Sequence, residues 1–181
     1  MRCPHHQCLV SCPLATLEDH LTRHPGSPTP PAAAAPLATT RHFPLAPALP
    51  GEQAAFRLRS LEPLRFRHAG HTLYLQNIAS RDARHLYTFV QAEATREECD
   101  RLSATISVAS LNPYAVSGVR QTVRPTPLDL HCWDDLPAIG EAVVLTERAV
   151  ISVLTYDGER KRYQFKVEVE VKEDEPEVVP Q

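Results

Sequence analysis

The stretch Tyr163-Gln-Phe-Lys-Val-Glu-Val-Glu-Val171 alternates apolar and polar side chains from one residue to the next. A β-strand points successive side chains to opposite faces, so this period of two puts one face on a core and the other in water. Shorter alternating stretches are His71-Thr-Leu-Tyr-Leu-Gln76, Leu86-Tyr-Thr-Phe-Val-Gln91 and Thr105-Ile-Ser-Val108. Many short strands broken by turns predict a mainly β fold, an antiparallel β-sandwich.

Two segments of this region permit other structures. The stretch from Val150 to Glu159, followed by the strand from Tyr163, predicts a hairpin with Asp157-Gly158 near its turn. A short helix over 147–154 is the competing interpretation. The segment 95–102, Thr-Arg-Glu-Glu-Cys-Asp-Arg-Leu, is too polar and too brief for a core strand, so it predicts a turn or a helical connection.

Ahead of the β-rich region, Cys3, Cys8, His20 and His24 follow the pattern C-x4-C-x11-H-x3-H. Zinc favours four tetrahedral thiolate and imidazole ligands, and this set leaves no open position for a catalytic water. The spacing predicts a small C2H2-type zinc finger over residues 1–24, with a structural Zn²⁺ as cofactor. Because so short a segment buries little apolar surface, the metal would supply most of its folding free energy, about 10–16 kcal/mol.

The local sequence also predicts how the two histidines are presented. Thr16 followed by Asp19 fits a capping pair at the start of a helix. His20 and His24 would then lie one turn apart on one face of that helix.

Other metal ligands compete with these four. His5, His6 and Cys12 are additional donors, and Cys12 could replace Cys8 in a less well packed alternative. A Cys/His-rich segment that binds no metal is the remaining interpretation.

Between the finger and the β-rich region the composition shifts to Pro and Ala. The tract Pro28-Thr-Pro-Pro-Ala-Ala-Ala-Ala-Pro36 is unsuited to a sheet or a long helix. We interpret 25–50 as a semi-stiff linker, 51–172 as the sandwich and 173–181 as a solvated acidic tail. Modules on a linker should unfold independently, so we expect metal loss to leave the cooperative unfolding of the sandwich intact.

Charge and composition narrow the function classes. The 181 residues carry 19 Lys and Arg against 22 Asp and Glu, a net charge of −3, so no global field would collect nucleic acid. Neither a membrane-spanning run nor a secretory signal is evident, so we expect no membrane partner and a cytoplasmic or nuclear location. Cys99 and Cys132 are expected as buried structural thiols, and Trp133 as a core residue.

Several motifs are shared with one known family. Its second zinc finger has the same C-x4-C-x11-H start and a Leu-Glu and His-Leu element like Leu17-Glu-Asp-His-Leu21. Gly51-Glu52 resembles its Gly-Glu, and 86–91 with 95–97 resemble its Phe-Phe-x-x-Val and Gly-Thr-Arg-Lys elements. The stretch Thr122-Val-Arg-Pro-Thr-Pro-Leu-Asp-Leu-His131 resembles its Thr-Trp-Glu-Ala-Thr-Pro-Arg-Ser-Ile-His. The chain thus resembles the seven-in-absentia (Siah) ubiquitin ligases, built as a RING, two zinc fingers and a TRAF-like β-sandwich.

The resemblance implies the substrate- or partner-binding half of a ubiquitin ligase. In the family the RING docks the ubiquitin-charged conjugating enzyme, while the sandwich holds substrates and pairs two subunits. The 181 residues contain no RING, so we expect the chain not to transfer ubiquitin alone and to reach a conjugating enzyme only through a RING elsewhere. Implied partners are protein substrates or extended peptides, and a second copy in a homodimer. The alternative is an adaptor or competitor outside ubiquitin transfer.

A sandwich with exposed edge strands can take up an extended peptide as an added strand. The family's groove includes a Trp, which residues 49–67 lack. Candidates for the groove lining, each of which could equally be ordinary core, are Leu49, Phe56, Leu58 and Phe66. A stripe of alternating arginines could receive an acidic partner, or simply face solvent. These arginines are Arg57, Arg59, Arg65 and Arg67.

Two other function classes fit less well. A two-Cys, two-His finger can place a helix in the DNA major groove, but Glu18 and Asp19 occupy this helix start and Arg23 is its only cation. Independent catalysis would need a nucleophile, a base and an orienting group, and the sequence has no phosphate loop or nucleophile elbow. His85 and His131 are expected as partly exposed strand-end residues. We assign no catalytic residue.

Overall fold

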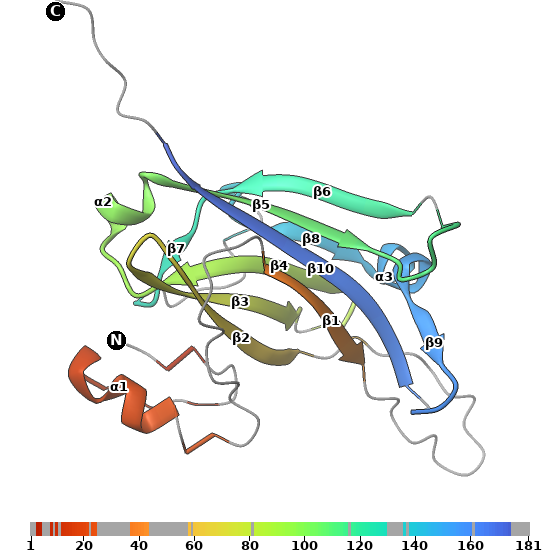
Figure 1. Ribbon diagram of the computed structural model, residues 1–181, viewed down its shortest axis with the longest axis horizontal. Helices are drawn as coiled ribbons and strands as arrows, with labels where there is room; N and C mark the ends of the chain where they lie inside the picture. Colours follow the sequence, from red (N-terminus) through yellow and green to blue (C-terminus); the bar gives the residue numbers. More distant parts are fainter. Residues whose placement is uncertain are drawn as a thin grey trace, which may run out of the picture.

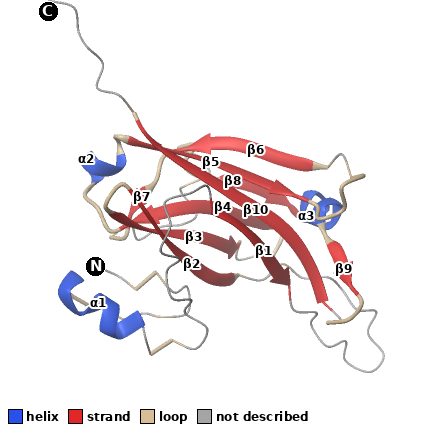
Figure 2. Ribbon diagram, in the orientation of Figure 1, coloured by secondary structure: helices blue, strands red, loops and turns tan. Residues whose placement is uncertain are grey.

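The computed structural model describes residues 3–4, 8, 10, 12–21, 23–24, 37–43, 58, 60–80, 82–115, 117–129, 136, 138–160 and 162–174. Over these residues the chain forms two β-sheets and three helices (Figures 1 and 2). None of these helices is long and apolar enough to cross a membrane. In chain order the elements are α1 (Leu14–Leu21), β1 (Leu37–Phe43), β2 (Leu61–His68), β3 (His71–Ala79), β4 (His85–Ala92), α2 (Arg96–Cys99), β5 (Leu102–Ala109), β6 (Gly118–Val123), β7 (Thr126–Pro127), β8 (Val143–Thr146), α3 (Glu147–Val153), β9 (Thr155–Asp157) and β10 (Arg162–Glu173).

The mainly β prediction is confirmed. The first sheet has the order β1-β10-β5-β6, with β9 also paired to β10. The second sheet has the order β2-β3-β4-β7, with β8 also paired to β4. All pairs are antiparallel except the short parallel pair of β4 with β7. We call the two sheets with their connections the β body.

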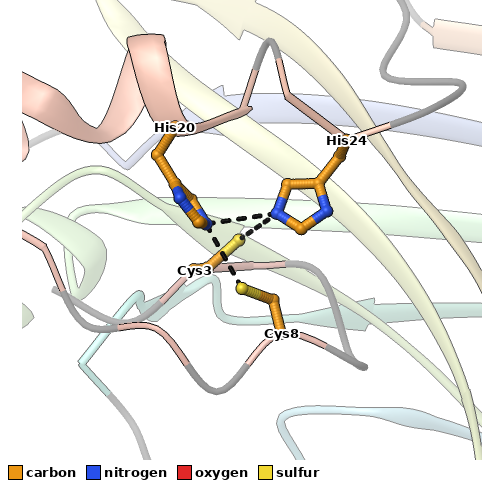
Figure 3. Close-up of side chains that lie close together, drawn as sticks. All are labelled: Cys3, Cys8, His20 and His24. Carbon is orange, nitrogen blue, oxygen red and sulfur yellow. Dashed lines mark hydrogen bonds between the residues drawn. The ribbon is translucent and has the colours of Figure 1, made fainter.

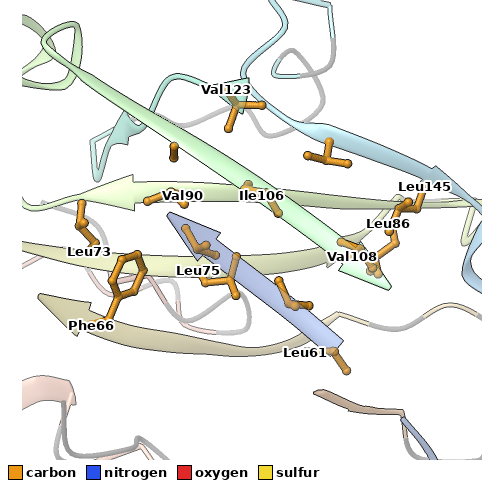
Figure 4. Packing of buried hydrophobic residues seen from close by; sticks show 14 of the residues in the cluster. Leu61, Phe66, Leu73, Leu75, Leu86, Val90, Ile106, Val108, Val123 and Leu145 are labelled. Atoms are coloured by element: carbon orange, nitrogen blue, oxygen red, sulfur yellow. The ribbon is translucent and has the colours of Figure 1, made fainter. Parts of the chain in front are cut away.

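The two sheets enclose one apolar core (Figure 4). In β10 the residues Phe165, Val167 and Val169 are almost completely buried, whereas Lys166 and Glu168 between them are only partly buried. They meet residues such as Leu73 and Leu75 of the second sheet. The period of two in the sequence therefore marks the core face of the first sheet.

β1 corrects the expected linker. Residues 37–43 pair with β10, and Thr39 lies opposite Val167. Phe43 is 1% exposed, and its ring stacks on Phe165 with centroids 5.3 Å apart. The interpretation of all of 25–50 as a linker outside the fold is wrong here, because these seven residues contain no proline and so keep every backbone donor for the ladder. The rest of 25–50 lies outside the described residues.

Both interpretations of residues 147–159 are correct in part. α3 is the short helix, and the side chain of Thr146 caps it by accepting a hydrogen bond from the backbone of Ala149. β9 and β10 then form the hairpin around Asp157 and Gly158. α2 confirms the helical connection at 95–102, and Thr95 caps it in a reciprocal capping box.

The second sheet is buried on both faces where β3 and β4 cross its centre. Every residue from Thr72 to Ile78 is buried, although the alternating pattern predicted one wet face. The outward-facing Ile78 and Phe89 are covered by a segment that includes Leu136 and Ala142. Farther along the same face, Tyr74 and Leu128 pack against the amino-terminal residues, and Figure 1 shows α1 beside this sheet. The finger is therefore docked on the β body.

The role of β1 is tested by two substitutions in that strand. Phe43→Ala should lower the free energy of unfolding by about 3–5 kcal/mol, because it empties a site in a close-packed core. Thr40→Ala, at an exposed position of the same strand, should cost less than about 1 kcal/mol. Denaturant-induced unfolding measures both. Equal, small effects would mean that this segment does not belong to the fold.

Candidate metal centre

The amino-terminal ligand loop is closed by the backbone. Cys3 N donates a hydrogen bond to Val10 O at 3.0 Å, which brings together the two ends of the stretch that contains Cys8. His20 lies in the last turn of α1, so the helix fixes the position of its backbone. Cysteines from a tight loop and histidines from a helical segment thus converge on one point.

The helix differs from the prediction at both ends. It begins at Leu14, and the hydroxyl of Thr16 donates to Pro13 O at 3.1 Å, so the expected helix start at Thr16 is wrong. A proline just before the first turn has a fixed φ that suits a helix start, and this outweighs the capping pattern two residues later. At the other end α1 stops at Leu21, and His24 N bonds Leu21 O at 3.0 Å in a tighter turn.

The four donor atoms lie together in spite of these differences (Figure 3). Cys3 Sγ is 3.4 Å from His24 Nε2, and Cys8 Sγ is 3.2 Å from His20 Nε2. The two Nε2 atoms are 3.1 Å apart, and all four donors lie within 4.8 Å of one another. Cys3 is only 2% exposed, and the other three side chains are partly buried.

This arrangement fits a single tetrahedral ion. Metal–sulfur and metal–nitrogen bonds of the usual zinc lengths put two nitrogens about 3.4 Å apart, and a sulfur and a nitrogen about 3.6 Å apart, around a tetrahedral centre. The observed separations of 3.1 to 3.4 Å are close to these values. The four side chains therefore lie close enough to bind a metal ion, and two sulfurs with two imidazoles form a closed ligand set.

The structure brings one of the two competing cysteines into the four-donor cluster. Cys8 supplies the second sulfur of the cluster, while Cys12 is partly buried beside it. Cys99 is completely buried in the core, as expected for a structural thiol, and burial raises its pKa to about 11. A thiol that ionises so reluctantly is a poor ligand. Two further possible donors, His5 and His6, lie outside the described residues. The same holds for three residues with other expected roles, namely His131, Cys132 and Trp133.

Side chains of the β body pack against the residues that carry the cluster. Leu17 and Leu21 of α1, with Cys3, pack against Tyr74 of β3 and Leu128, which follows β7.

A hydrogen bond joins the same two parts. The side-chain amide of Gln76 in β3 donates to Pro4 O at 2.7 Å, directly after the first cysteine ligand, and Gln76 is completely buried. Nearby, Tyr74 donates its hydroxyl proton to Glu93, and burial together with this bond raises the pKa of Tyr74 well above its usual range.

Sequence reasoning missed Tyr74, Gln76 and Leu128 as parts of the site. A usable signal was present, because residues 72–79 of β3 and 86–92 of β4 contain no charged residue. A strand with one wet face normally carries charges or small polar groups there, as β10 does with its lysines and glutamates. Uncharged outward positions indicate that something covers the sheet.

The peptide-groove candidates lie elsewhere. Leu58 and Phe66 are 3% and 4% exposed and belong to the core between the sheets, which was the alternative open for them. Side chains this deeply buried line no open groove in the structure. Leu49 and Phe56 lie outside the described residues, as do the first two arginines of the stripe. Arg65 is partly buried and Arg67 is exposed in β2.

The ligand assignment is tested by a matched pair of cysteine substitutions. Cys8→Ser removes one of the four donors and should weaken metal binding by more than about 100-fold, beyond what a change outside the ligand shell costs. Cys12→Ser should leave one metal ion per chain. Elemental analysis and competition with a chromogenic chelator measure both proteins, and loss of metal from the Cys12 variant alone would reverse the assignment.

Comparison with known proteins adds no family. The chain matches no protein-family model. No curated protein matches it either. The assignment of a function consequently rests on the four-donor cluster, on its support by the sheet and on the motifs of the sequence.

Proposed function

We propose that this chain is the substrate- or partner-binding part of a Siah-like ubiquitin ligase system. The observation that carries the proposal is a four-donor Cys/His cluster in the order C-x4-C-x11-H-x3-H, directly followed along the chain by a two-sheet β body. The same modules follow one another in the family that the motifs resemble, where the body is a TRAF-like sandwich. In this proposal the chain selects a partner and a RING elsewhere performs the transfer.

Zinc is the ion that this ligand set suits best. Two thiolates and two imidazoles favour a borderline-soft ion with tetrahedral geometry over hard ions such as Mg²⁺ or Ca²⁺, which prefer oxygen ligands. When bound, zinc supplies a cross-link between the loop of Cys3 and Cys8 and the segment of His20 and His24. Its role here is structural, because the four protein ligands complete the coordination sphere.

Partner binding in this proposal uses an edge of the first sheet. Among the described strands, β6 pairs on one side only, with β5. Arg120, Gln121 and Thr122 of β6 are exposed, and Figure 2 shows this strand at the border of the sheet. An extended peptide added to such an edge gains main-chain hydrogen bonds, while its alternate side chains meet the sheet face. A homodimer, as the family resemblance implies, belongs to the same proposal.

A peptide-display selection on the zinc-loaded full chain tests the binding role. It should enrich extended peptides that share preferred residues at alternate positions. The reason is that successive side chains of an added strand point to opposite faces of the sheet, so every second side chain has the same surroundings. In an edge strand neighbouring amides point alternately toward the partner strand and away from it. One of the variants Arg120→Pro and Gln121→Pro should therefore keep the fold and lose the peptide, whereas the other should also destabilise the body. Binding by fluorescence polarisation and calorimetry separate the two effects.

The link to ubiquitin needs its own assay. Fused to an active RING domain and supplied with a conjugating enzyme, the chain should direct ubiquitin to a reporter that carries a selected peptide. The chain alone should not. Two results contradict the proposal: no peptide is selected, or the chain is instead retained on nucleic acid with a steep salt dependence, as a DNA-binding finger would be.

A further inference from the structure

The metal cluster and the second sheet share a buried hydrogen-bonded contact. Gln76 Nε2 lies 2.7 Å from Pro4 O and 3.0 Å from Gln91 Oε1, so the two protons of this amide serve the finger on one side and β4 on the other. Both glutamines are completely buried. Gln91 pairs with Tyr74 across the β3–β4 ladder, so the two amides and the tyrosine form one patch on the outer face of the sheet.

We propose that Gln76 is a positioning residue of the metal centre, and that metal binding by the finger is thereby coupled to the stability of the β body. The inference rests on the metal site and not on the ubiquitin role.

The backbone on both sides of Cys3 is held by hydrogen bonds. Pro4 directly follows the ligand Cys3, and its ring fixes φ, which removes one of the two rotations between the Cys3–Pro4 peptide and the Pro4 carbonyl. Gln76 holds this carbonyl from the sheet, while Val10 O accepts the backbone N–H of Cys3 from the loop. The backbone of Cys3 is therefore fixed on both sides. Its thiolate can meet the ion without first losing the freedom of an unsupported loop.

Apolar side chains of the finger and the body also pack together around this hydrogen bond. Leu17 and Leu21 of the finger close over Tyr74 and Leu128 of the body in one apolar cluster with Cys3. The module that the metal would fold therefore also covers this patch of the sheet.

Thermodynamic linkage couples metal binding by the finger to its docking on the sheet. If docking on the sheet favours the metal-bound finger, the bound metal must favour docking by the same factor. A ligand that binds only the folded, docked state also raises the temperature at which that state unfolds. Zinc should therefore stabilise the body as well as the finger, which a finger on a flexible tether would not do. This revises the expectation that the body unfolds independently of the metal.

A matched pair of variants in β3 tests the coupling on the full chain. Gln76→Ala removes the donor to Pro4, and Asn77→Ala removes a neighbouring amide that is equally buried but donates to Thr88 Oγ1 within the sheet. The Gln76 variant should bind Zn²⁺ about five- to tenfold more weakly in chelator competition, because a buried carbonyl loses its partner. The Asn77 variant should bind zinc like the parent protein.

Calorimetry distinguishes positioning from a merely structural role. Asn77→Ala should lower the unfolding temperature of the body equally with and without zinc. Gln76→Ala should instead shrink the upward shift that zinc produces, with a smaller effect on the metal-free protein. The visible spectrum of the Co²⁺-substituted chain should also change for the Gln76 variant alone, because Cys3 is no longer held in place.

Two results overturn the inference. Equal zinc affinity, zinc-induced shift and Co²⁺ spectrum in the parent and the Gln76 variant would show that the sheet does not position the site. A body whose unfolding temperature does not respond to zinc would show the same. A chain that binds no zinc removes the metal site itself, and the inference with it, while leaving peptide selection by the body as a separate question.

Discussion

The structure depends on one constraint, which is that the central strands of the second sheet have no face suited to water. Toward the core they present Leu73 and Leu75, and outward they present Tyr74, Gln76 and Phe89, none of which carries a charge. Such a surface has to be covered, because exposed apolar area is costly and buried amides need partners. The other sheet has no such need, since its outward positions on β10 carry lysine and glutamate. The asymmetry between the sheets explains why the finger sits on one of them.

The finger and the sheet compensate for each other's deficiencies. A module of about two dozen residues has too little apolar surface to fold alone, and a metal ion bound by its four donors would supply what the core lacks. In this molecule the sheet contributes further, since Leu17 and Leu21 are buried against Tyr74 and Leu128 rather than inside the finger. The sheet in turn gains a cover whose Pro4 carbonyl accepts a hydrogen bond from the amide of Gln76. Each part is incomplete without the other.

Much of this was readable from the sequence, and the exceptions have physical causes. The four donors were predictable because a tetrahedral ion restricts ligand type and spacing, whatever the exact helix bounds. β10 was predictable because its outer face is wet and its pattern is strict. β1 was not, because seven strand residues lie inside a tract whose overall composition is Pro and Ala. The core position of Phe66 could not be told from a groove position, since alternation marks a face but not what covers it.

The pairing of β1 with β10 bears on how the molecule is made. The strand nearest the start of the body lies against the last strand, with Thr39 opposite Val167, and β10 also separates β1 from β5. During synthesis β1 lacks its observed neighbour until β10 has left the ribosome. Closing such a long loop is slow, so the first sheet cannot be completed before β10 has been synthesised, and strand edges stay open in the meantime. Newly made chains are therefore expected to need chaperone protection until β10 arrives.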